Sequence, residues 1–218
     1  MLTEDQEARV NAAVKEAESA TSGEIFCILT QRTSRYVETP LAYGAVAALL
    51  VPLGLVAFGL QPWSWMGWGT GDVSPETAVL AYTLLQAASF LITLGLTSIP
   101  RVRVLLVPEP LKRSRVRRAA FQQFLAKGLH QTRDRTGVLI FAAMDERRAE
   151  VIADEGIYGQ VSSEIWTEAL EALAAGLKAG DPAKGFEDAV RLCGEVLAKH
   201  FPPKADNPNE LPDQIVTL

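Results

Sequence analysis

The stretch TGVLIFAAMDERRAEVIADEGI, residues 136–157, decides the fold because it reads as two strands joined by a turn. Two apolar runs, residues 137–144 and 149–153, flank a charged DERR turn. Apolar runs of this length joined by a short polar turn are typical of an antiparallel hairpin. The second run ends in the acidic tripeptide at residues 154–156. These acids either bind a ligand or mark the point where the strand leaves the sheet.

The rest of the chain around this hairpin patterns as an α/β domain. Thr3 and Gln6 form a capping box that starts a helix, and EIFCILTQ at residues 24–31 reads as a buried strand. The segment at residues 101–107 fits either a short strand or the end of a preceding helix. Further helices are predicted at residues 113–129, 162–178 and 182–201. The first of them carries, on one apolar side, Val116, Ala120, Phe121, Phe124 and Leu125.

Two segments contain no charged residue, LAYGAVAALLVPLGLVAFGL at 41–60 and AVLAYTLLQAASFLITLGLTSI at 78–99. At about 1.5 Å per residue, each helix spans roughly 30 Å, the thickness of the hydrocarbon core of a bilayer. The alternative is a helical hairpin buried in a soluble core, but helices that are apolar all round need a larger core than this chain offers. We therefore expect two transmembrane helices that interrupt the α/β domain.

The charges around these segments predict the topology. The connecting loop holds Trp63, Trp65 and Trp68 and no Lys or Arg, whereas the basic residues lie on the outer flanks of the two segments. Tryptophan favours the headgroup interface, and basic residues favour the cytoplasmic side. Both termini are therefore expected in the cytoplasm, with a multi-pass chain that crosses the membrane twice. The basic run at residues 101–118 is expected to contact anionic headgroups.

The composition excludes several classes of function. Acidic residues outnumber basic ones, 26 to 21, which argues against nucleic-acid binding. Cys27 and Cys193 stand far apart and read as core residues, and His130 and His200 lie near helix ends. No G-x-S-x-G motif, P-loop or GxGxxG motif occurs. We therefore assign no catalytic residue.

A divalent cation is the ligand that the strand-end acids suggest. Glu24 opens the first strand, and Asp154 with Glu155 follows the last one. Ca²⁺ or Mg²⁺ binds several oxygen ligands, which separate loops can supply, so these three carboxylates are the candidate metal ligands. Asp145 belongs to the opposite end of the hairpin and cannot join them. In the alternative interpretation the acids only end strands and pair with Arg133 or Arg135.

Three segments together resemble a known family: TSGEI at residues 21–25, RTGVLIF at 135–141 and ERRAEVIADEGI at 146–157. They are similar to the TPM domain, named after a thylakoid-lumen acid phosphatase, a photosystem II repair factor and a receptor modulator. In particular they look like the bacterial branch of uncharacterised membrane proteins, which implies a place in a bacterial inner membrane. The resemblance implies an α/β/α sandwich with a small mixed sheet. It also implies either divalent-metal-dependent phosphatase activity or binding of partner proteins.

These observations give one domain plan and two functional hypotheses. The first hypothesis is a non-enzymatic, membrane-tethered interaction or maintenance factor for a membrane protein complex with an unidentified membrane protein partner. The second is a metal-dependent acid phosphatase. The predicted segments are a first domain part at residues 1–36, spans at 41–60 and 78–99, a Trp-rich external loop at 61–77, a second domain part at 101–201 and a disordered tail at 202–218.

Overall fold

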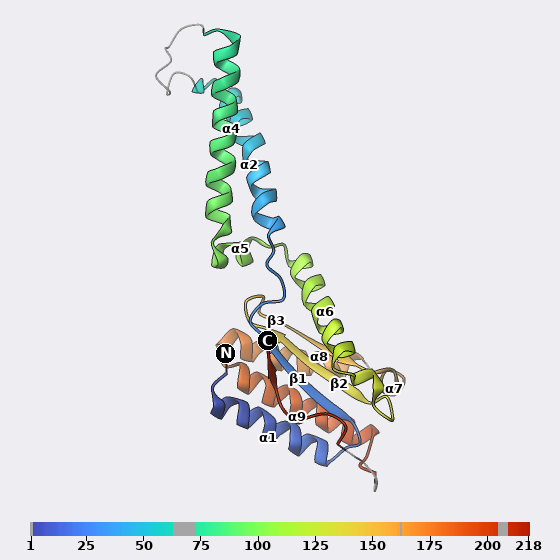
Figure 1. Cartoon of the computed structure of the whole chain (residues 1–218). Helices are drawn as coiled ribbons and strands as arrows, with labels where there is room; N and C mark the ends of the chain where they lie inside the picture. The colour runs from blue at the N-terminus through green and yellow to red at the C-terminus, as the bar shows by residue number, and fades with distance from the viewer. Residues whose placement is uncertain (1, 63–72, 162, 205–208) are drawn as a thin grey trace. The chain divides into compact units, whose positions relative to one another are not determined.

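The computed structural model divides into two compact units, with the elements labelled in Figure 1. The α/β domain joins residues 1–34 to residues 109–218, and the helical unit holds residues 35–108. The predicted interruption of the domain is therefore present. The domain resumes at residue 109 rather than at residue 101, because residues 100–106 form a helix of the other unit. The structure describes residues 2–62, 73–161, 163–204 and 209–218.

A mixed sheet with the strand order β3-β2-β1-β4 forms the centre of the α/β domain. β1 lies parallel to β2 and to β4, whereas β2 and β3 form the predicted antiparallel hairpin. Every residue of β1 and β2 is buried, because helices cover both faces of the sheet. The bounds are Glu24–Thr30 for β1, Gly137–Ala143 for β2, Arg148–Ala153 for β3 and Val216–Thr217 for β4.

Three helices cover one face of the sheet. α1 starts with the predicted capping box, in which the Thr3 side chain accepts from the Gln6 N–H and the Gln6 side chain accepts from the Thr3 N–H. α9 starts at Pro182 and is capped by Asp181, whose carboxylate accepts from the Lys184 N–H at 3.1 Å. The bounds are Glu4–Ser19 for α1, Ser163–Ala179 for α8 and Pro182–His200 for α9.

A single long helix, α6 (Glu109–Ala126), covers the other face and is followed by the 3₁₀ turn η1 (Leu129–Gln131). Val116, Ala120 and Phe124 contact the sheet side chains Phe26, Ile28 and Phe141 in one core cluster. The sequence prediction was wrong for Phe121 and Leu125, which are 52% and 44% exposed. Side chains at adjacent positions of a helix point in directions about 100° apart. Phe121 therefore cannot face the sheet together with Ala120, nor Leu125 together with Phe124. The result is the α/β/α sandwich with a small mixed sheet that the sequence predicted.

The predicted disorder of residues 202–218 is wrong for residues 209–218. β4 extends the sheet beside β1, and the Leu218 N–H donates to the carbonyl of Leu29 at 2.9 Å. The Ile215 N–H donates to the Asn11 side chain of α1 at 2.8 Å. Backbone groups on the outer edge of a strand need partners, and this tail supplies them to β1.

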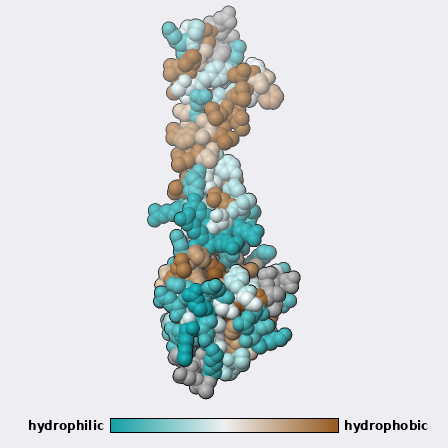
Figure 2. All heavy atoms as spheres, turned by 90° about the vertical axis from the view of Figure 1, so that its right-hand side faces the viewer, coloured by the Kyte–Doolittle hydropathy of each residue, from teal (hydrophilic) through white to brown (hydrophobic). Residues whose placement is uncertain are grey.

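The helical unit contains two long apolar helices, α2 (Glu38–Ala57) and α4 (Pro75–Ser98), and the short α5 (Pro100–Leu106). α2 and α4 pack against each other, with Gly44 allowing the close approach of the Phe90 ring. Both are long and apolar enough to cross a membrane. Figure 2 shows apolar residues gathered along this unit. The predicted external loop falls largely on residues 63–72, including its three tryptophans, which lie outside the described residues.

Candidate functional site

The candidate ligands lie at the edge of the sheet where β1 and β2 begin and β3 ends. The register pairs Glu24 with Gly137, and the Asp154 N–H donates to the Gly137 carbonyl at 2.9 Å. Glu24 and Asp154 therefore flank the same residue of β2. Asp145 lies at the opposite end of the hairpin, as predicted, where its carboxylate pairs with Arg32 at 2.7 Å.

Arg135 pairs with both acids at the end of β3. Its Nε lies 3.4 Å from Asp154 Oδ2, and its second guanidinium nitrogen lies 3.3 Å from Glu155 Oε2. Asp154 also caps α7 (Glu155–Tyr158), because its carboxylate accepts from the Glu155 N–H at 2.7 Å. The geometry around Arg135 therefore agrees with the alternative interpretation, in which these acids end a strand and pair with an arginine. The Arg133 N–H instead donates to the Glu210 carboxylate at 3.1 Å.

Arg135 is held in a backbone conformation that side chains rarely adopt. Its φ is 58°, and such a left-handed residue costs on the order of 1–3 kcal/mol unless its surroundings stabilise it. Here its N–H donates to the Thr132 carbonyl at 3.0 Å, and its guanidinium donates to the His130 carbonyl at 2.6 Å. The Gly156 N–H donates to the Arg135 carbonyl at 3.1 Å. Sequence reasoning named Arg135 but had no signal for this conformation.

Gly156 makes this arrangement possible by its lack of a side chain. A Cβ at this position would lie 2.6 Å from the Arg135 carbonyl oxygen and 2.7 Å from that of Asp134. We expect Gly156→Ala to displace the loop that carries Arg135 and to destabilise the domain by about 1–3 kcal/mol. Thermal unfolding in detergent measures this loss. Gly159→Ala is the matched control, because no atom lies within 4 Å of the added Cβ; an equal effect of both substitutions would contradict the prediction.

Glu24 is 4% exposed and binds the C-terminal tail rather than Arg135. Its Oε2 accepts from the Leu211 N–H of the C-terminal tail at 3.2 Å. Burial raises the pKa of Glu24, and hydrogen bonds from the backbone of Glu210 and Leu211 offset part of this increase. Glu24 therefore helps to hold the tail.

Glu18, near the end of α1, is a half-buried acid that sequence reasoning missed. Its carboxylate accepts from the Ile25 N–H at 2.7 Å. The pKa of Glu18 is raised to about 8, mainly by burial. The hydrogen bond from Ile25 offsets part of this increase, and the charges of Glu24 and Asp213 add to it. The tail thus docks on α1 and β1 through a group of acids. No pattern in the sequence places the tail beside Glu18.

The three candidate metal ligands do not converge. Glu24 accepts from the tail, whereas Asp154 and Glu155 face Arg135. Within the described residues, no group of three or more His, Cys, Asp or Glu side chains is arranged to hold a metal ion. The buried atom Asp154 Oδ2 accepts no hydrogen bond from the described residues and lies 3.4 Å from Arg135 Nε. Metal binding by these three residues stays a prediction.

The cysteines lie in the core, in agreement with the sequence analysis. Cys27 and Cys193 are both free and buried in the cluster between the sheet and the three-helix layer. Burial raises the pKa of Cys193 to about 12 and that of Cys27 well above its ordinary value. Because the thiolate is the nucleophilic form, neither thiol is activated for nucleophilic chemistry.

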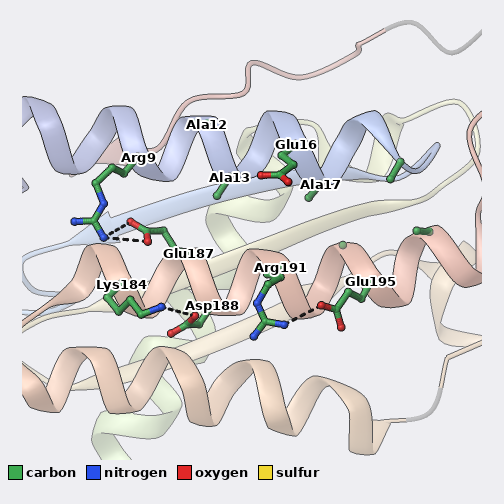
Figure 3. Close-up of a pocket in the computed structure, with 13 residues that line it drawn as sticks. Arg9, Ala12, Ala13, Glu16, Ala17, Lys184, Glu187, Asp188, Arg191 and Glu195 are labelled. Carbon is green, nitrogen blue, oxygen red and sulfur yellow. Dashed lines mark hydrogen bonds and ion pairs between the residues drawn. The ribbon is translucent and has the colours of Figure 1, made fainter.

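A groove of about 760 Å³ lies between α1 and α9 (Figure 3). Small residues allow the helices to approach, and a Cβ on Gly194 would lie 2.7 Å from the Cβ of Ala17. Six of its seven charged lining side chains, all but Glu16, form three ion pairs: Arg9 with Glu187 at 2.7 Å, Lys184 with Asp188 at 2.8 Å and Arg191 with Glu195 at 2.8 Å. The groove is therefore explained by close packing and internal ion pairs.

Comparisons with known proteins place this geometry in a family context. Residues 94–196 match the family model of the TPM domain. The NMR structure of the BA42 protein from the psychrophilic bacterium Bizionia argentinensis is similar, with a TM-score of 0.58 and 21% identity over 100% of this chain and 96% of that chain. At that identity the likeness concerns the fold alone. No curated protein matches the chain. The family match confirms the resemblance seen in the sequence: residues 94–196 are similar to the TPM domain.

Proposed function

We propose that the chain is a membrane-tethered TPM domain that acts by binding rather than by catalysis. In this proposal α2 and α4 cross the inner membrane of a bacterium, and the α/β domain lies on the cytoplasmic face. There it organises or maintains a membrane protein complex through a membrane protein partner.

The exposed apolar surface of α2 and α4 is the observation that carries the proposal. Large apolar side chains are exposed along both helices, including Leu53 and Ile92, each 63% exposed. Contact of apolar surface with water costs about 25 cal/mol per Å², and soluble proteins rarely expose contiguous apolar patches of this kind. A bilayer covers such surface without a protein partner. This supports membrane tethering over a soluble helical hairpin.

The basic residues around the helices support the proposed orientation. Arg32 and Arg35 precede α2, and the basic run at residues 101–118 follows α4. In α5, the Arg103 guanidinium donates to the carbonyls of Ser98 and Arg35, which stabilises the end of α4. The positive-inside rule assigns this side to the cytoplasm. In this proposal, the exposed basic residues of the run that are nearest in sequence to α4 contact anionic headgroups. Each of them contributes about 1 kcal/mol to the attraction to the membrane.

Cysteine labelling tests the tethering and the orientation. Glu76→Cys places a thiol at the start of α4, and Glu4→Cys places one in the α/β domain, both at exposed positions. We expect both proteins to resist alkaline carbonate extraction. A membrane-impermeant maleimide should label Glu76→Cys in spheroplasts and Glu4→Cys only after permeabilisation. The wild-type thiols give little background because both are buried. Extraction by carbonate would refute tethering, and the reverse labelling pattern would refute the orientation.

The contacts at the sheet edge support binding over catalysis. Asp154 and Glu155 pair with Arg135, and Glu24 accepts from the Leu211 amide. A metal ion at this end of the sheet would have to compete with the Arg135 guanidinium for Asp154 and Glu155. A structural role in fixing the loop and the tail accounts for each of these side chains.

A metal-dependent phosphatase is the second candidate, favoured by one atom. Asp154 Oδ2 is buried without a hydrogen bond from the part of the chain that the structure describes, and a Ca²⁺ or Mg²⁺ ion held with Glu24 and Glu155 would satisfy it. Calorimetric titration of Ca²⁺ and Mg²⁺ tests this candidate. Binding that Asp154→Asn abolishes and Asp145→Asn retains would establish the site and displace the first proposal. We expect no binding to wild type at millimolar metal.

A further inference from the structure

α6 contacts the sheet with one side and leaves the other side exposed within the described part of the α/β domain. Its outer side carries Phe121 and Leu125. In the described part of the α/β domain, the exposed large hydrophobic side chains are Phe121, Leu125, Tyr158 and Leu218. Two of the four therefore lie one turn apart on this one helix, and burial of both would remove apolar area from water.

The exposed side of α6 has the spacing of a helix-docking face. The exposed residues Ser114, Arg118, Phe121 and Leu125 follow one another at intervals of four, three and four residues. Residues at these intervals form one stripe along a helix. The stripe lies opposite the buried residues Val116, Ala120 and Phe124, which contact the sheet.

The charges beside this stripe are positive. α6 holds Lys112 and four arginines against a single acid, Glu109, which already pairs with Lys112 and Arg148. Arg113 and Arg117 interact with the Glu150 carboxylate on β3. Arg118, in the middle of the stripe, is exposed and forms no ion pair with any described residue. The stripe thus combines two apolar anchors with a cation that is open to an acidic group.

We infer that the outer face of α6, defined by Ser114, Arg118, Phe121 and Leu125, docks an acidic amphipathic helix of the partner protein. Apolar side chains of the partner cover Phe121 and Leu125, and a carboxylate pairs with Arg118. This inference rests on the proposed function and specifies the surface through which the domain binds. Arginine and aromatic residues are also enriched among the residues that dominate binding energy at interfaces.

A helical partner fits the stripe better than a lipid surface does. Helices that lie on a membrane separate an apolar side from a basic side along their whole length. Here Arg118 lies within the stripe, between Ser114 and Phe121, and both apolar anchors lie in the C-terminal half of α6. Interleaved apolar and charged positions are typical of helix–helix interfaces that select one partner.

Site-specific photo-crosslinking in intact cells tests the inference. A photoreactive amino acid replaces Phe121 or Leu125, and Tyr158 is the matched control because it is an exposed aromatic residue on α7, outside the stripe. We expect protein adducts at residues 121 and 125 but not at residue 158, with an acidic amphipathic segment at the crosslinked site. Arg118→Glu in the same chain should lower the adduct yield about tenfold, because like charges then face each other.

Other adducts would overturn the inference. Lipid adducts at residues 121 and 125 would make α6 a membrane-contact helix, and adducts with a second copy of the chain would make it a self-association surface. Equal yields at residue 158, or an unchanged yield with Arg118→Glu, would also refute it. Carbonate extraction of the same cells tests membrane tethering separately, so a failure of docking is distinguishable from a failure of the proposed function.

Discussion

Raising the pH from about 5 to about 9 should lower the melting temperature of the α/β domain, and Glu18→Gln should remove most of this decrease. The Glu18 carboxylate lies between the end of α1, the Ile25 amide and the C-terminal tail. Burial, followed by the charges of Glu24 and Asp213, raises its pKa from 4.5 to about 8. The neutral form of Glu18 is therefore the form that the folded domain favours.

The sign of this effect follows from the direction of the shift. A folded-state pKa above the unfolded value means that the folded domain binds an extra proton between the two values. The stabilisation is complete below about pH 4.5 and is lost as the pH rises through about 8. Burial also raises the pKa of Glu24, which acts in the same direction. We expect a loss of about 2 kcal/mol, less than the full shift implies, because solvent screens the partly exposed Glu18.

Thermal unfolding of the detergent-solubilised chain at several pH values measures the effect. A loss of about 2 kcal/mol corresponds to roughly 5 °C for a domain of this size. Glu16→Gln is the matched control, since Glu16 is an exposed acid on the same helix. A double Glu18→Gln/Glu24→Gln variant should have the flattest profile. Equal pH profiles for wild type and Glu18→Gln would disprove the role of Glu18.

Gly176→Leu should destabilise the α/β domain by about 3 kcal/mol or more, the other large effect that the structure predicts. Gly176 of α8 faces Gly185 of α9 at the closest approach of the two helices. A Cβ on Gly176 would lie 2.5 Å from the Gly185 Cα and 2.8 Å from the Asp181 carbonyl oxygen. These neighbours are backbone atoms, so a whole helix has to move to admit the side chain. Separation of α8 from α9 would open the core around Leu173 and Phe186.

Ala175→Leu is the matched control for this substitution. It adds the same side chain at the preceding position, which is exposed. We expect a change within about 0.5 kcal/mol there, as for most surface substitutions. Circular dichroism at the melting transition, or trypsin resistance at room temperature, distinguishes the two variants. If Gly176→Leu and Ala175→Leu have the same melting temperature, then the close approach of α8 and α9 does not limit the packing of this layer.

The elements with strong local signals were predictable from the sequence. The capping box of α1, the β2–β3 hairpin and the apolar segments of α2 and α4 each depend on residues that are close in the chain. Local side-chain pattern and turn chemistry determine such elements. The same reasoning placed Glu24 and Asp154 at strand ends, which the register confirms.

Features that depend on tertiary contacts were not predictable. β4 has only two residues, Val216 and Thr217, too few to show a period, and its position depends on β1. The direction of the Glu24 and Asp154 side chains depends on Leu211 and Arg135, which contact them from distant parts of the chain. The sequence could therefore name the candidate acids but not their partners.

The two strands that pair with β1, namely β2 and β4, both follow α2 and α4 in the chain, and this order has a consequence for biosynthesis. β1 leaves the ribosome early, but β2 and β4 follow it by more than a hundred residues. At 5–20 residues per second, the apolar strand EIFCILT waits for roughly 5–20 s before β2 exists. The apolar α2 and α4 emerge within that interval. If α2 and α4 cross a membrane as proposed, their insertion precedes completion of the sheet. In either case the nascent N-terminal part needs protection from aggregation while translation continues.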